Sequence, residues 1–166
     1  MANSDIPSGA KPNGELLRAT RYVAGGTIYP GDFVIRENTG KVLTGAASTA
    51  LLGVALDYAV LDGNVLVADD PDQRFSCQVD STDIAAQTNL GLNYNIVATA
   101  GNSSYRRSNH EINVAVADVA DPTLATLPIK IISIVSAPNN AFGANVKAIF
   151  YINNHALGGH TGTAGV

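Results

Sequence analysis

The sequence has little of several residue types on which function is often built. A single cysteine among 166 residues excludes an internal disulfide. There is no tryptophan, and aromatic residues make up 6% of the chain. Charged residues make up 14%, against about a quarter in an average soluble domain. Much of the surface must therefore be neutral or be covered by a partner.

Basic residues are scarce as well. Ten Lys and Arg residues oppose 14 Asp and Glu residues, which gives a formal net charge of −4. Nucleic-acid binding needs a dense basic footprint, because neutralisation of phosphates supplies most of the affinity. We therefore expect no direct nucleic-acid binding. The first residues lack the basic and apolar regions of a signal peptide, and the longest apolar run, residues 131–135, is too short for a membrane span. We expect a protein made and used in a soluble setting.

A β pattern fills the middle of the chain. Residues 64–80 (NVLVADDPDQRFSCQVD) alternate between apolar and polar on both sides of an acidic turn. Such an alternation is typical of half-buried strands, and Pro71 with its Asp neighbours favours a turn. This stretch therefore predicts a β-hairpin.

Short strands are expected along most of the remaining chain, at residues 15–24, 33–37, 42–43, 51–59, 94–98, 111–116, 127–135 and 145–152. Residues 81–89 favour a single helical turn, capped by Ser81, Thr82 or Asp83. Many short strands with little helix predict an all-β fold, a single β-barrel or sandwich-like domain of antiparallel strands. We place Phe33 and Phe75 in its core.

We expect residues 15–153 to form this domain, flanked by two extended arms. Residues 1–14 contain two prolines, two glycines and several small polar residues, which cannot offset the entropy lost on ordering. They predict a flexible arm that orders only on a partner and whose deletion leaves the domain folded. Residues 154–166 (NHALGGHTGTAGV) predict a Gly-rich tail.

Clusters that could bind metal or perform catalysis are weak. Carboxylates of the kind that bind Ca²⁺ gather at Asp69, Asp70 and Asp72, with Asp80 and Asp83 downstream. Their spacing is not that of a calcium-binding loop, and Asp is common in turns because it bonds nearby backbone N–H groups. We therefore favour turn chemistry and expect no metal ion and no cofactor.

The histidines and the cysteine are equally isolated in the sequence. Two histidines lie in the Gly-rich tail and one in a polar loop: His155, His160 and His110. Cys77 falls on the apolar side of a strand, where a buried thiol is expected, and no neighbouring cation would activate it. No nucleophile elbow or phosphate-binding loop occurs. We expect a protein that is not an enzyme.

Several stretches together resemble one known family. They are RYVAGGTIYPGDFV (21–34), LLGVALDYA (51–59), VLVADDPDQRFSCQVDS (65–81), RRSNHEI (106–112) and LPIKIISIVSAPNNAFGANVKAIFYINNH (127–155). In this order the chain is similar to the head decoration, or cement, proteins of tailed bacteriophages, small structural proteins encoded beside the major capsid protein. Each stretch is weak alone, and the ordered set from about residue 21 to 155 carries the resemblance.

The resemblance implies a β-rich, non-enzymatic protein on the outer surface of the phage head, made in the cytoplasm of the bacterial host. Such proteins bind the major capsid protein, often as homotrimers, and stabilise the capsid. On this interpretation we expect the capsid contacts to include Lys11, Arg18, Arg21 and Tyr22.

Two other functions stay open at this point. A virion-displayed module that binds a receptor or a carbohydrate would need aromatic platforms, for which the candidates are Tyr58, Tyr94, Tyr105 and Phe142. A hydrolase is a more distant alternative, and activity abolished by changing His110 would support it.

Overall fold

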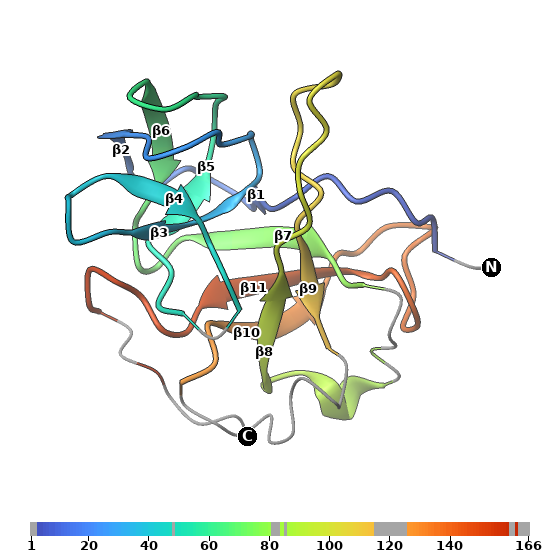
Figure 1. Cartoon of the computed structure of the whole chain (residues 1–166). Helices are drawn as coiled ribbons and strands as arrows, with labels where there is room; N and C mark the ends of the chain where they lie inside the picture. Colours follow the sequence, from blue (N-terminus) through green and yellow to red (C-terminus); the bar gives the residue numbers. More distant parts are fainter. Residues whose placement is uncertain are drawn as a thin grey trace.

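The computed structural model describes residues 3–47, 49–80, 84, 86–114, 126–159 and 162. Within these residues the chain forms eleven β-strands and one 3₁₀ turn, Gln87–Asn89. The strands pair antiparallel in two sheets (Figure 1), so the predicted all-β, sandwich-like class is confirmed. Nowhere in the described ranges does a helix have the length and apolar character needed to cross a membrane.

The two sheets divide the strands unequally. The six-stranded sheet has the order β1 (Lys11–Pro12), β7 (Arg74–Gln78), β11 (Lys147–Ile152), β10 (Ile129–Ile134), β8 (Asn93–Val97) and β9 (Glu111–Asn113). The five-stranded sheet has the order β2 (Ala19–Val23), β6 (Asn64–Ala68), β5 (Gly53–Ala55), β3 (Phe33–Arg36) and β4 (Val42–Thr44). Single bridges join Val79 to Ile112 and Ala24 to Val42, so each sheet curls back toward its first strands.

Two apolar cores follow from this arrangement. The first holds Phe33, Phe75 and Phe150, whose rings pack in series with centroids 5.7 and 5.8 Å apart. Phe33 and Phe75 are fully buried, which confirms their predicted place in the core. The second core lies within the five-stranded sheet and includes Val65 and Val67.

The predicted hairpin over residues 64–80 is wrong in its pairing. Both strands exist, but β6 pairs with β2 and β5, whereas β7 pairs with β1 and β11 in the other sheet. The acidic connection therefore carries the chain from one sheet to the other. Alternation reveals which side of a strand is buried and says nothing about which strand lies beside it. Here Val65 and Val67 enter the second core while Phe75 and Cys77 enter the first.

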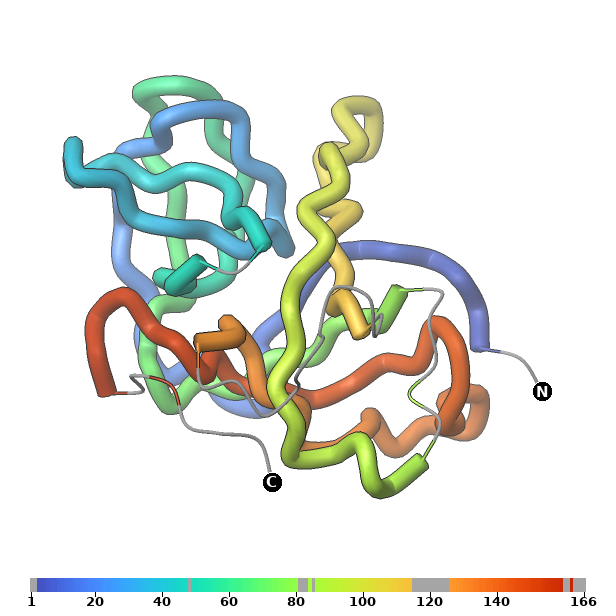
Figure 2. Tube along the Cα trace, turned by 60° about the horizontal axis from the view of Figure 1, so that its bottom comes forward, coloured from blue at the N-terminus to red at the C-terminus, as the bar shows by residue number. Residues whose placement is uncertain are grey.

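The described part of the N-terminal segment packs on the domain. The Ala10 N–H donates to the carbonyl of Gly31, and Ala10 is buried. The Asn3 amide donates to the carbonyls of Ala141 and Ala144. Figure 2 traces this segment across the molecule toward the five-stranded sheet. We name residues 3–14 the strap. An arm that orders only on a partner was expected here, and the strap instead supplies β1 of the six-stranded sheet.

The C-terminal boundary and the helical turn also differ from expectation. His155, expected in the flexible tail, is buried and forms a bridge with Leu51. The packed structure therefore continues past residue 153. Of the helix expected at residues 81–89, a 3₁₀ turn forms at Gln87–Asn89, and the capping positions 81–83 lie outside the described residues.

Candidate functional site

Two of the predicted capsid contacts, Arg18 and Tyr22, bind a carboxylate of their own chain. Arg18 Nε lies 3.0 Å from Asp69 Oδ1, and its Nη2 donates to the Asp69 carbonyl at 2.6 Å. The Tyr22 hydroxyl donates to Asp69 Oδ2 at 2.7 Å. Burial raises the pKa of Asp69, but the hydrogen bonds from Tyr22 and Arg18 outweigh it and hold this pKa below its usual value. The network fixes β2 to the start of the connection between the sheets.

An Asp69→Asn substitution is expected to lower the free energy of unfolding by about 1–3 kcal/mol, because a hydrogen bond to a charged group is worth about that much. The matched control is Asp70→Asn, since Asp70 accepts the backbone N–H of Asp72, a bond that an asparagine oxygen also accepts. Urea unfolding of both variants at neutral pH measures the difference. Equal losses would show that the network adds nothing beyond a turn.

The other two predicted contacts, Arg21 and Lys11, lie on different sheets. Arg21 is on β2, with Nη1 3.9 Å from Asp57 Oδ2; the Arg21 side chain is largely exposed and that of Asp57 partly exposed. Lys11 is on β1, opposite Ser76 of β7. The structure therefore gathers Arg18, Arg21 and Tyr22 around β2 and places Lys11 elsewhere.

Three cations that the strand register brings together form a second surface. Lys11 lies opposite Ser76, and Lys147 lies opposite Gln78. Directly opposed residues project from the same face of a sheet, and side chains alternate along β7. Arg74 therefore shares the outward face with Ser76, Gln78 and both lysines. We name Lys11, Arg74 and Lys147 the basic face.

The three residues of the basic face are all exposed. The ion pairs found among the described residues involve Arg18, Arg21, Lys41 and His110, and none of these three. Lys130 follows on the same outward side in β10, but it is mostly buried, and burial lowers its pKa. Sequence reasoning found Lys11 and missed Arg74 and Lys147, because only the register places them beside it.

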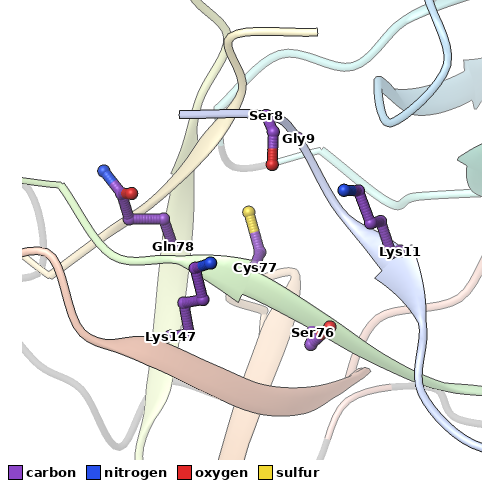
Figure 3. Close-up of a pocket in the computed structure, with 7 residues that line it drawn as sticks. All are labelled: Ser8, Gly9, Lys11, Ser76, Cys77, Gln78 and Lys147. Atoms are coloured by element: carbon purple, nitrogen blue, oxygen red, sulfur yellow. The ribbon is translucent and has the colours of Figure 1, made fainter. Parts of the chain in front are cut away.

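A small pocket opens beside the basic face. It has a volume of about 90 Å³ and is lined by Ser8, Gly9, Lys11, Ser76, Cys77, Gln78 and Lys147. Figure 3 shows the strap on one side of β7 and β11 on the other, with a lysine reaching toward the pocket from each. The strap provides one wall, so the pocket exists only while the strap is docked.

His110 occupies the joint between the sheets. Its Nδ1 accepts the backbone N–H of Phe33 at 3.1 Å, and its Nε2 lies 3.4 Å from Asp32 Oδ1. Asp32 Oδ2 in turn accepts the N–H of Tyr29. Burial lowers the pKa of His110, and the charge of Asp32 opposes this shift. Both ring nitrogens face groups of the chain itself, so the geometry suits cross-linking of β3 to the segment before β9.

The remaining candidate groups have structural surroundings. Cys77 is buried, its thiol donates to the His110 carbonyl at 3.5 Å, and burial raises its pKa well above the usual value. Asp70 and Asp72 meet in a turn, as expected. Over the described ranges, no group of three or more side chains is placed to hold a metal ion. Asp83 and His160 lie outside those ranges.

The four aromatic candidates do not share one surface. Tyr94 is buried, and its hydroxyl donates to the carbonyl of Asn89. Tyr58 lies under the guanidinium of Arg106, 4.8 Å from its ring centroid. Tyr105 is 77% exposed in the β8–β9 connection, whereas Phe142 belongs to the β10–β11 connection.

Comparison with known proteins gives no assignment. No family model matches this sequence, and no curated protein matches it either.

Proposed function

We propose that this protein is a non-enzymatic decoration protein of a tailed-phage head, which binds the outer surface of the major capsid protein lattice and stabilises it. The proposal rests first on the ordered resemblance noted above. The resembling stretches supply β5, β7, β10 and β11 with most of β6 and the start of β3, and thus much of both cores. They also include the acidic connection between the sheets. The resemblance therefore covers the framework of the fold as well as its surface.

The observation that carries the proposal is the exposed surface of a chain so poor in charge. Large apolar side chains are exposed beside β2 at Val23, Val60 and Leu61, with exposed fractions of 40, 49 and 60%. The turn that holds the last two is bound to the end of β2, because the N–H of Asp62 donates to the Ala24 carbonyl. These side chains form one apolar end, and exposed apolar patches are typical of surfaces that bind other proteins.

Trimer symmetry would make modest contacts of this kind sufficient for tight attachment to the capsid. In a trimer placed on a three-fold position of a capsid, each modest contact is repeated three times, and linked contacts bind far more tightly than one alone. A surface poor in charged side chains suits permanent attachment of this kind.

The expected result is a solution mass three times that of one chain, co-sedimentation with isolated heads, and a higher temperature of head disruption. Light scattering measures the mass, and pelleting with heads purified without this protein measures attachment. A monomer that leaves heads unchanged in both assays contradicts the proposal. Binding to a glycan array without binding to heads would favour the receptor- or carbohydrate-binding alternative instead.

A further inference from the structure

We propose that the basic face is a docking surface for an acidic protein surface, and that the pocket between Lys11 and Lys147 receives the carboxylate of an Asp or Glu side chain. The inference rests on the proposed function, and it adds to the apolar end a second surface through which this molecule meets the capsid.

Charge identifies the partner chemistry. The chain has a net charge of −4, yet Lys11, Arg74 and Lys147 gather on neighbouring strands, and no carboxylate of the described residues forms an ion pair with any of the three. Cations that repel each other across a sheet cost stability, and anions from a partner remove that cost. Complementary charge also steers association and fixes the docked register.

The size and lining of the pocket indicate which chemical group it binds. Its volume of about 90 Å³ is small, and its lining includes the hydroxyl-bearing Ser8 and Ser76 with the two lysines. A carboxylate accepts hydrogen bonds from ammonium and hydroxyl donors together. In Figure 3 Lys11 and Lys147 approach the pocket from opposite sides of β7, an arrangement that places two cations around one small anion.

Charges at the far end of the pocket favour a protein over a nucleic acid. Gln78 Nε2 donates to Asp5 Oδ1 and to Glu111 Oε1, both at 2.9 Å. A polyanion that continues beyond the lysines would meet these carboxylates and be repelled. A protein can place one acidic side chain at the lysines and a neutral or basic one opposite Gln78. The pattern therefore selects a partner with localised negative charge.

The test compares two double charge reversals of equal size. The Lys11→Glu/Lys147→Glu variant changes the basic face. The Arg36→Glu/Lys41→Glu control changes two cations on the side of the five-stranded sheet, the exposed Arg36 and the partly buried Lys41, whose ion pair with Asp62 it also removes. We expect the first variant to lose about tenfold or more in affinity for heads and for a poly-glutamate peptide. A tenfold loss corresponds to about 1.4 kcal/mol of binding free energy. The control should bind both within about twofold of the unchanged protein. Lys11→Gln/Lys147→Gln gives the same comparison if the reversal unfolds the protein, as thermal melting would show.

The outcomes separate this inference from the proposed function. If the unchanged protein pellets with heads and the first variant pellets equally well, the docking inference is overturned and the proposed function stands. If the unchanged protein does not bind heads, both are overturned. Tighter binding to double-stranded DNA than to poly-glutamate at the same salt concentration overturns the choice of an acidic protein as the partner.

Discussion

A Gly9→Ala variant should lose about 2–5 kcal/mol of unfolding free energy, a large part of the 5–15 kcal/mol that is usual for a domain. Gly9 has φ of +69°, where an L side chain costs about 1–2 kcal/mol. A Cβ built there would also lie 2.5 Å from Ser108 Cβ and 2.7 Å from the carbonyl carbon of Gly31. Forcing a methyl group into packed surroundings typically costs a further 1–3 kcal/mol.

Gly14→Ala is the matched control for this prediction. Gly14 belongs to the same strap and has φ of +84°, but a Cβ there would meet nothing within 4 Å. It should therefore lose only the backbone part, about 1–2 kcal/mol. Denaturant unfolding of both variants measures the difference. Losses of equal size would mean that the strap does not dock between Gly31 and Ser108.

Acid should weaken the protein through His110 before it affects the carboxylates. The pKa of His110 is lowered from its ordinary value of 6.5, mainly by burial, so the folded state binds fewer protons than the unfolded state below that pH. Stability is therefore complete above about pH 6.5 and falls as the pH drops toward the folded-state pKa, by at most about 1.4 kcal/mol per pH unit. Protonation at Nδ1 would also remove the acceptor for the Phe33 N–H.

A His110→Gln variant isolates this effect. Its unfolding free energy should change less between pH 7 and pH 5 than that of the unchanged protein. Asp69 contributes little to either slope, because its lowered pKa places its loss of stability below about pH 4. Burial, Asp5 and Asp80 raise the pKa of Glu111, which gives a slope of the opposite sign, but Glu111 is common to both proteins and cancels in the comparison. Identical slopes would contradict the prediction.

The sequence predicted the strands well and their partners poorly. The alternation around Val65 and Phe75 identified two real strands, because it reports burial of one side of each. Their assignment to different sheets depends on β2 and β11, which lie far away in the chain. No local pattern contains that information, and a turn-like connection such as residues 69–73 suits a crossing between sheets as well as a hairpin.

The site residues illustrate the same limit. The strap has the composition of a linker, but position 9 requires a glycine because Gly31 packs closely against it. The sequence does not reveal that Gly9 and Gly31 are neighbours. His110 sits in a polar stretch that predicts an exposed loop, but it is buried against Asp32 and Phe33, which lie 78 and 77 residues earlier in the chain. Arg74 and Lys147 joined Lys11 only through the register of three strands.

The strap also constrains when the protein can finish folding. The side chain of Asn3 bonds to the carbonyls of Ala141 and Ala144, which are synthesised 138 and 141 residues after it. At roughly 5–20 residues per second, synthesis separates these partners by about 7–28 seconds. Contacts between residues far apart in the sequence slow folding because the intervening loop must close first. Until the strap docks, the edge of β7 that β1 covers is open to pairing with other chains, so nascent copies can aggregate through that edge.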